Sequence, residues 1–276
     1  MREIVGALGL VILFGCNDSG PLAPSDDSDS QRLLAHLAIS GRPEGPTGAT
    51  WTYRDTVAGV VYDLTGVLLK PEGAGPFPAV IVSHGFGGSA SNYSRNVGST
   101  IVGWGAVVIA TNYTHAVNGP AGAPGTTTEP GASAVNVMRA RRLAEILRAL
   151  GYVDMSRLAA HGHSMGAFVT TALAATHPDL LRVASHTAGG VRPDGVSGAA
   201  PSEAQGRAIR TPYQMHHGDR DAVVLVSADQ RLSTILTSVG TTHELLVYPG
   251  GDHDDVAFDA AVLERIRAWY TRYGMF

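Results

Sequence analysis

One serine stands between two glycines, in Gly162-His163-Ser164-Met165-Gly166. A serine held in a sharp turn of this kind can attack an acyl carbonyl if a base removes its proton. The pattern alone is weak, because a chain with 34 glycines is expected to contain about 0.3 such matches by chance. The other reactive residues and the elements around them must therefore decide the role of Ser164.

Two later segments carry the residue types that a nucleophilic serine needs. His217-Gly218-Asp219-Arg220-Asp221 follows one apolar stretch, and Gly250-Gly251-Asp252-His253 follows the next. Where a serine lies on a sharp turn between a strand and a helix, its partners follow along the chain in the order serine, acid, histidine. This order favours Asp221 as the acid and His253 as the base. Asp219 is the alternative acid.

An acyl-transfer site also needs two N–H donors for the oxyanion. The residue after the serine supplies one, so the Met165 N–H is expected to be a donor. The glycine-rich segment His84-Gly85-Phe86-Gly87-Gly88 follows an apolar stretch, and we expect the Phe86 N–H to be the second. His84 is expected to shape this loop and not to transfer protons.

Short apolar runs alternate with helical patterns over most of the chain, which predicts an α/β fold with a mostly parallel sheet and helices on both faces. Ser164 then lies where a central strand turns into a helix, at the sheet edge where ligands bind. The expected strands are 65–69, 79–82, 106–110, 157–161, 180–187, 211–216 and 244–248. The expected helices are 93–102, 133–150 with Ser133 as N-cap, 165–176, 228–239 and 256–273.

Residues 51–276 are predicted to form a single catalytic domain. The segment between Thr187 and Thr211 is rich in glycine and proline and predicts a loop, so no large cap domain is expected. The loop 114–131 is expected to form one wall of the site, with Tyr113 or His115 near its base.

The chain from about Gly66 onward resembles the α/β-hydrolase superfamily. The HGFGG, VDMSRLAAHGHSMGA, HGDRDAVV and YPGGDH segments carry the resemblance. It is most similar to the branch of dienelactone hydrolases, chlorophyllases and cutinase-like polyesterases. The resemblance implies hydrolysis of carboxylic esters without a cofactor, with Ser164 as nucleophile, Asp221 as acid and His253 as base.

The chain departs from that branch in several places. Dienelactone hydrolases typically use a cysteine where this chain has Ser164. Polyesterases usually read GHSMGG, and Ala167 replaces the third glycine here. They often carry a C-terminal disulfide, but Cys16 is the only cysteine of this chain. The segment Ser185–Gly189 also lacks the aromatic residue that they place there, which disfavours an aromatic polyester as substrate.

The N-terminus predicts export. Residues 4–14 form an apolar run that is too short to span a bilayer and fits a signal peptide. The run ends at Leu13-Phe14-Gly15-Cys16, which resembles the lipobox of bacterial lipoproteins. Residues 1–15 are therefore expected to be a signal peptide, and residues 16–50 an acidic Ser/Pro tether and lead-in. Cys16 would be lipidated and hold the protein on a membrane of the bacterial envelope. Plain secretion and a buried core cysteine are the alternatives.

Charge and spacing exclude other classes of function. The formal charge is −4 and Lys70 is the only lysine, so we expect no nucleic-acid partner. No H-x-x-x-H or C-x-x-C spacing occurs, and no catalytic metal or cofactor is expected. Structural calcium at the acidic loop 252–255 stays open. The alternatives to an esterase are a polyester hydrolase, an acyltransferase with the same triad and a non-catalytic surface binding module.

Overall fold

A nine-stranded sheet runs through the part of the chain that the computed structural model describes, residues 27–45, 47–117 and 129–276. The strand order is β1-β2-β3-β5-β4-β6-β7-β8-β9. The strands are β1 (Leu37–Ser40), β2 (Ala49–Val57), β3 (Val60–Leu69), β4 (Phe77–Ser83), β5 (Val107–Thr111), β6 (Val153–His163), β7 (Val183–Thr187), β8 (Tyr213–Gly218) and β9 (His243–Tyr248). The first four positions in the sheet pair antiparallel, and the remaining strands from β5 to β9 pair parallel.

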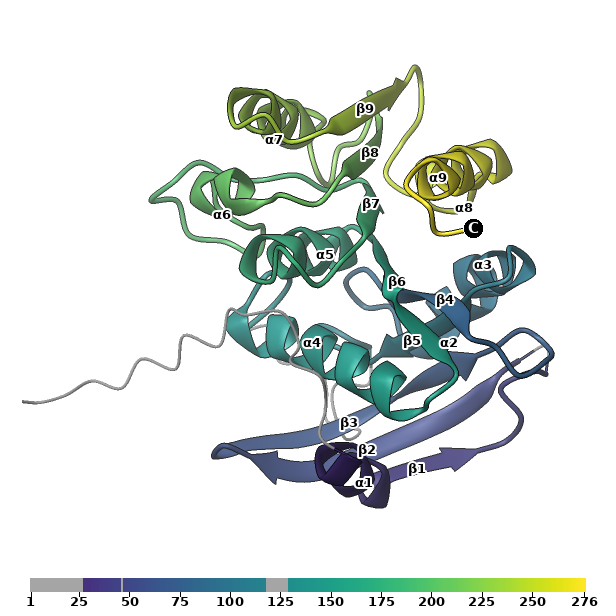
Figure 1. Ribbon diagram of the computed structural model, residues 1–276. Helices are drawn as coiled ribbons and strands as arrows, with labels where there is room; N and C mark the ends of the chain where they lie inside the picture. Colours follow the sequence, from purple (N-terminus) through teal and green to yellow (C-terminus); the bar gives the residue numbers. More distant parts are fainter. Residues whose placement is uncertain (1–26, 46, 118–128) are drawn as a thin grey trace, which may run out of the picture.

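Helices cover both faces of this sheet (Figure 1). One face packs against α1 (Asp27–Ala35), α4 (Ala134–Ala149), α5 (Met165–Thr176) and α7 (Ser227–Ser238), with the short α6 (Glu203–Ala208) beside α5 and α7. The other face packs against the consecutive segments α2 (Ala90–Tyr93), η1 (Ser94–Gly98) and α3 (Ser99–Gly103), and against α8 (Asp255–Phe258) and α9 (Ala260–Arg272). The predicted α/β-hydrolase architecture, mostly parallel with helices on both faces, is confirmed.

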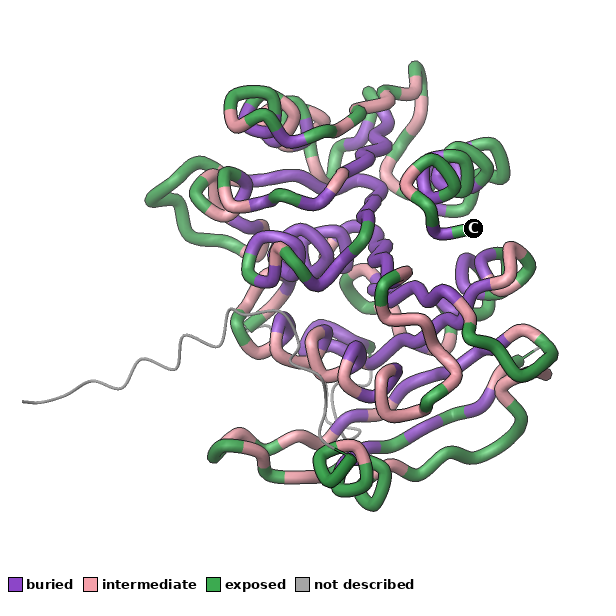
Figure 2. The backbone as a smooth tube through the Cα atoms, viewed as in Figure 1, coloured by how far each residue is buried: buried purple, intermediate pink, exposed green. Residues whose placement is uncertain are grey.

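The central parallel strands are buried on both sides, as Figure 2 shows for the centre of the molecule. Ala79, Val80, Ile81 and Val82 of β4 are each at most 1% exposed. A strand whose two faces are covered reads as a continuous apolar run without alternation, which is why β4 is visible in the sequence. The ends of β4, β6 and β8 therefore form a rigid base for the loops that follow them.

The antiparallel part of the sheet extends further toward the N-terminus than expected. Strand β2 alternates between the core and solvent, with Trp51 and Tyr53 inside, and β1 pairs with it along its whole length. Helix α1 and β1 fall in the segment expected as tether and lead-in. Residues 1–26, with the expected signal peptide and Cys16, lie outside the described residues.

Three segments differ from the helices and loops that the sequence predicts. The helix expected at 93–102 is divided into α2, the π-helical η1 and α3. The helix expected at 256–273 is broken at Asp259, whose side chain accepts from the Val262 N–H and caps α9. The expected loop 187–211 contains α6, which Ser202 and Gln205 start with a reciprocal capping box.

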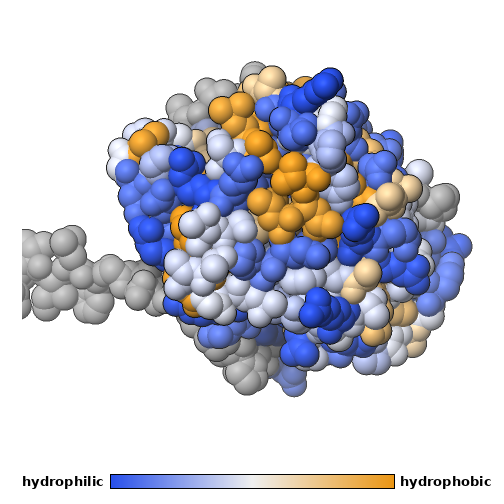
Figure 3. Space-filling model, turned by 90° about the horizontal axis from the view of Figure 1, so that it is seen from above, coloured by the Kyte–Doolittle hydropathy of each residue, from blue (hydrophilic) through white to orange (hydrophobic). Residues whose placement is uncertain are grey.

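Strand β9 closes the sheet and has β8 as its one hydrogen-bonded neighbour among the described strands. Figure 3 looks onto the molecule from this end, where apolar side chains gather in a patch that hydrophilic side chains surround. Val247 of β9 is 40% exposed. Among the described helices, none has both the length and the apolar content to cross a bilayer.

Candidate active site

Ser164 lies in a strained turn between β6 and α5. Its backbone has φ 57° and ψ −121°, a combination that costs a non-glycine residue free energy and persists where the surrounding structure fixes it. The two flanking glycines make the turn possible. A Cβ on Gly162 would lie 2.2 Å from the Gly166 carbonyl oxygen, and a Cβ on Gly166 would lie 2.0 Å from the Ser83 carbonyl oxygen. The sharp turn that the sequence predicts at Ser164 is present, and it brings the backbone at Gly162 and Gly166 too close to neighbouring carbonyl groups for any side chain.

Ser164, His253 and Asp221 lie in one hydrogen-bonded chain. The His253 Nε2 is 2.9 Å from the Ser164 Oγ, and the His253 Nδ1 is 2.7 Å from the Asp221 Oδ2. The three residues follow the ends of β6, β8 and β9. In the sheet these strands stand in the order β6-β7-β8-β9, so that β7 alone separates β6 from the other two. A histidine between a serine and a carboxylate can take the serine proton while the carboxylate fixes its tautomer.

Asp221 is held as an ionised acceptor. Its Oδ1 accepts from the N–H groups of Val223 and Val224, both at 2.8 Å. Burial opposes ionisation, but the hydrogen bonds from His253 and from these two N–H groups outweigh it and lower the pKa of Asp221. Asp219, the alternative acid, instead accepts from the Gly250 N–H at 2.7 Å and thereby ties the loop of the acid to the loop of the base.

The two expected oxyanion donors are placed beside the serine. A Cβ on Gly85 would lie 3.2 Å from the Ser164 Cβ, so the loop that carries Phe86 packs directly against Ser164. Met165 is the first residue of α5. Neither the Phe86 N–H nor the Met165 N–H donates a hydrogen bond to any described residue. Both remain available to a developing oxyanion.

Two buried histidines hold the loop of residues 84–88, which carries Phe86, in place. His84 donates from Nδ1 to the Gly85 carbonyl and accepts at Nε2 from the Tyr113 N–H. The His115 Nε2 is 3.1 Å from the His84 carbonyl, and the His115 carbonyl accepts from the Gly87 N–H. Burial lowers the pKa of His84 to about 3 and that of His115 to about 4, so both are neutral near pH 7.

This bracing changes the expected role of the segment after β5. Either Tyr113 or His115 was expected near the base of a wall of the site. Both are buried, at 0% and 2% exposure, and through His84 they support the loop that carries Phe86. Residues 118–128, most of the expected wall, lie outside the described residues.

Comparison with known proteins identifies the family of this chain. The family model of the dienelactone hydrolase family matches residues 64–262. The chain belongs to the dienelactone hydrolase family. A comparison with curated proteins found no match.

Solved structures show how widely the fold of this family member occurs. A candidate dienelactone hydrolase from Klebsiella pneumoniae is 20% identical, with a TM-score of 0.66 over 81% of this chain and 98% of that one. An esterase from Thermogutta terrifontis is 18% identical, with a TM-score of 0.60 over 80% and 93%. An S-formylglutathione hydrolase from Agrobacterium tumefaciens is 14% identical, with a TM-score of 0.66 over 86% and 99%. At these identities the similarity establishes the shared fold.

Two other histidines that follow Ser164 in the chain of this dienelactone hydrolase family member have partners away from Ser164. The His243 Nε2 lies 3.1 Å from the Ser233 hydroxyl, and its Nδ1 lies 2.8 Å from the Thr241 carbonyl. The His186 Nε2 lies 2.7 Å from Asp229. Neither histidine contacts Ser164, so the geometry leaves His253 as the imidazole beside the nucleophile.

Sequence reasoning missed a buried group directly behind the acid. His217 and Asp229 have side chains at 0% exposure, and the His217 Nε2 lies 3.2 Å from the same Asp221 oxygen that His253 contacts. The usable signal was the position of His217, four residues before the acid in the HGDRD segment. The partner Asp229 sits within α7 and gives no signal in the sequence.

One group of described side chains has the composition of a metal site. Ligand atoms of His163, His253 and Asp254 lie within 4.8 Å of one another. The His253 nitrogens, however, already contact Ser164 and Asp221, so a metal there would displace the serine. Burial lowers the pKa of His163 to about 4, and this neutral ring packs beside the His253 ring at 4.8 Å between centroids.

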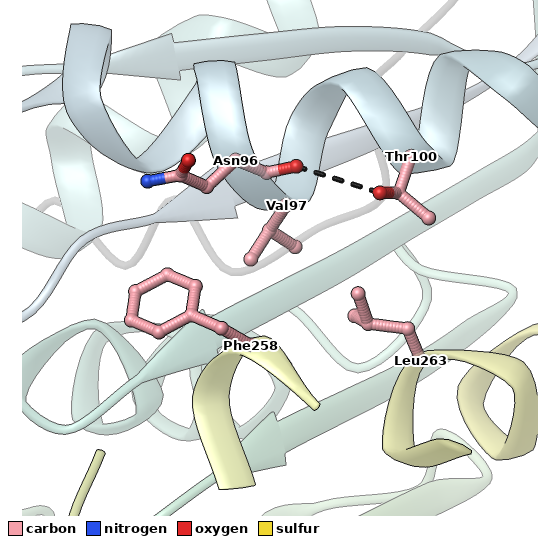
Figure 4. Close-up of a pocket in the computed structure, with 5 residues that line it drawn as sticks. All are labelled: Asn96, Val97, Thr100, Phe258 and Leu263. Carbon is pink, nitrogen blue, oxygen red and sulfur yellow. Dashed lines mark hydrogen bonds between the residues drawn. The ribbon is translucent and has the colours of Figure 1, made fainter. Parts of the chain in front are cut away.

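Exposed apolar side chains surround the triad. Phe86 is 61% exposed on the oxyanion loop, Val223 and Leu225 are exposed on the acid loop, and Phe258 is half exposed after the base. The Phe258 ring lies 6.5 Å from the His163 ring. It also lines a separate cavity of about 300 Å3, in which Phe258 and Leu263 face Asn96, Val97 and Thr100 across the gap between α8–α9 and η1–α3 (Figure 4).

Proposed function

We propose that this protein is an exported serine hydrolase of carboxylic esters that works through an acyl-enzyme. The observation that carries the proposal is the chain from the Ser164 Oγ through His253 to Asp221, with contacts of 2.9 and 2.7 Å. The membership in the dienelactone hydrolase family supports a hydrolase. The fold shared with an esterase from Thermogutta terrifontis is compatible with an ester substrate.

The reaction follows from the positions of these groups. The His253 Nε2 takes the Ser164 proton as the Oγ attacks the ester carbonyl, and Asp221 stabilises the imidazolium that forms. The N–H groups of Phe86 and Met165 hold the tetrahedral oxyanion. The same Nε2 proton passes to the departing alcohol and leaves the acyl group on Ser164. Water then attacks the acyl-enzyme, loses a proton to His253 and releases the acid.

The surroundings of the triad favour an apolar acyl group on an open site. Phe86, Val223, Leu225 and Phe258 present apolar surface next to the nucleophile, and exposed apolar surface of this kind marks a binding site. Between β7 and β8 the described chain adds only the short helix α6. Bulky esters, including ester groups of a polymer, would therefore reach Ser164.

The export part of the proposal rests on the N-terminal sequence. The apolar run 4–14 and the Leu-Phe-Gly-Cys segment ending at Cys16 fit a lipoprotein signal. A lipid on Cys16 would place the catalytic domain at a membrane surface, with the segment before α1 as a spacer. Secretion without lipidation is the alternative, and labelling of Cys16 separates the two.

The test is hydrolysis of p-nitrophenyl esters of rising acyl length by the purified domain. We expect turnover that extends to long acyl chains, a loss of several orders of magnitude in Ser164→Ala, and unchanged turnover in Ser227→Ala, a matched change at an exposed helical serine. Added alcohols distinguish an acyltransferase, because a transferase would form a new ester. Turnover limited to the shortest esters would refute the open apolar site, and equal turnover in Ser164→Ala would refute the nucleophile.

A further inference from the structure

The catalytic acid is shared between two imidazole rings. The Oδ1 of Asp221 accepts from two backbone N–H groups, and its Oδ2 lies 2.7 Å from the His253 Nδ1 and 3.2 Å from the His217 Nε2. The Asp221 and His217 side chains are both at 0% exposure. The environment of His217 therefore acts directly on the oxygen that orients the base.

The partners of His217 determine its protonation. Its Nε2 lies 2.7 Å from the Val224 carbonyl, which can only accept, so Nε2 carries a hydrogen. Its Nδ1 lies 2.7 Å from the Asp229 Oδ2. The other oxygen of Asp229 lies 2.7 Å from the His186 Nε2. Burial disfavours the carboxylate, but these two imidazole contacts outweigh it and hold the pKa of Asp229 well below its usual range.

An ionised Asp229 requires a hydrogen on the His217 Nδ1 as well. Burial alone would lower the pKa of His217, but Asp229, the Val224 carbonyl and Asp221 together raise it. His186 needs no charge, because its Nδ1 lies 3.1 Å from the Tyr213 hydroxyl, which can donate to it. One cation between two buried carboxylates also lowers the large cost of burying negative charge, because it halves the net charge from −2 to −1.

We propose that His217 is a permanently charged imidazolium that positions Asp221 and sets the pH at which His253 becomes an effective base. The inference rests on the proposed function of the triad. The cation contacts the Asp221 Oδ2, whereas the two backbone N–H groups contact Oδ1, and it offsets part of the negative charge that His253 experiences. With this cation present, a more acid pH is needed to protonate His253. Without it, His253 takes up a proton at higher pH.

The charge itself can be measured without any substrate. In 15N-histidine-labelled Ser164→Ala protein at pH 8, we expect NMR spectra to show one buried ring with both nitrogens protonated. That signal should disappear in the additional variant His217→Gln. A neutral ring at His217 at pH 8 would overturn the proposal, whether or not the protein hydrolyses esters.

The kinetic test compares two adjacent buried histidines of β8. His216 contacts Tyr248 and Gln214, has a pKa lowered by burial to about 3, and has no contact with the triad among the described residues. We expect His217→Gln to move the acid limb of kcat/KM upward by about one pH unit, the usual scale for a neighbouring charge. His216→Gln should leave that limb in place.

Asp229→Asn keeps a hydrogen-bonding partner for His217 but removes the negative charge that keeps it protonated. It should therefore move the acid limb in the same direction as His217→Gln, and it serves as the second variant if the first fails to fold. A uniform loss of kcat at every pH with an unmoved acid limb in these two variants would show a merely structural role. Equal limb shifts in His216→Gln would also overturn the proposal.

Discussion

Acid should destabilise this protein at pH values well above those at which its carboxylates titrate. Burial holds five histidines neutral in the folded state, with pKa values of about 3 for His84, His161 and His216 and about 4 for His115 and His163. In the unfolded chain a histidine takes up its proton near pH 6.5. Unfolding is therefore accompanied by proton uptake, and stability falls as pH falls below about 6.5.

The size of the effect follows from linkage. Between pH 7 and pH 5 each such histidine costs about 2 kcal/mol of folding free energy, so that five cost about 9 kcal/mol. His217 acts in the opposite direction, because its raised pKa provides stability that is complete below about pH 6.5 and declines above it, but over this interval the gain is only about 1 kcal/mol. The net loss of folding free energy between pH 7 and pH 5 is therefore comparable to the whole stability of a domain, about 5–15 kcal/mol.

Urea denaturation at pH 7, 6 and 5 measures this directly, because the change in free energy of unfolding with pH gives the number of protons taken up. We expect about four protons near pH 5 and cooperative unfolding without urea before about pH 4. His216→Gln should reduce the uptake by about one proton. A urea midpoint that is unchanged from pH 7 to pH 5, or an uptake of one proton or fewer, would refute the reasoning.

Three further predictions concern single side chains. Gly166→Ala should destabilise the fold by more than about 3 kcal/mol, because its Cβ would lie 2.0 Å from the Ser83 carbonyl oxygen; urea denaturation checks this, and a cost below about 1 kcal/mol would contradict the turn geometry. Asp221→Asn should lower kcat by about four orders of magnitude by releasing the histidine tautomer. Asp219→Asn keeps an oxygen that can accept from the Gly250 N–H and should lower kcat less than about tenfold; steady-state kinetics that reverse this order would make Asp219 the acid. Cys16→Ala should abolish metabolic palmitate labelling and release the protein from membranes, and unchanged labelling would exclude lipidation at this residue.

The parallel half of the fold could be predicted from the sequence because its signals are local. β4 and β5 are buried on both faces and appear as unbroken apolar runs. The turn at Ser164 needs two glycines within five residues, and those glycines are visible without any structure. Since parallel strands bring their carboxyl ends to one edge, the order of motifs along the chain also placed Asp221 and His253 near Ser164.

The remaining features depend on contacts between distant segments. Helix α1 and β1 follow an acidic, serine-rich segment, and their place in the fold comes from packing of Leu33 in the core and from pairing with β2. The break at Asp259 is an N-cap inside an otherwise continuous helical pattern. The contact between Asp229 and His217 joins α7 to β8 at a buried point, and sequence spacing does not reveal it.

The central claim is that Ser164 is a nucleophile activated by His253. Its most direct test is labelling of the purified domain with a fluorophosphonate probe, followed by intact mass and peptide mapping, in the wild type, Ser164→Ala and His253→Ala. The account predicts one adduct, on Ser164, and its loss in both variants while Ser227→Ala labels normally. A folded wild-type protein that takes up no probe, or carries the adduct on another residue, would contradict the account.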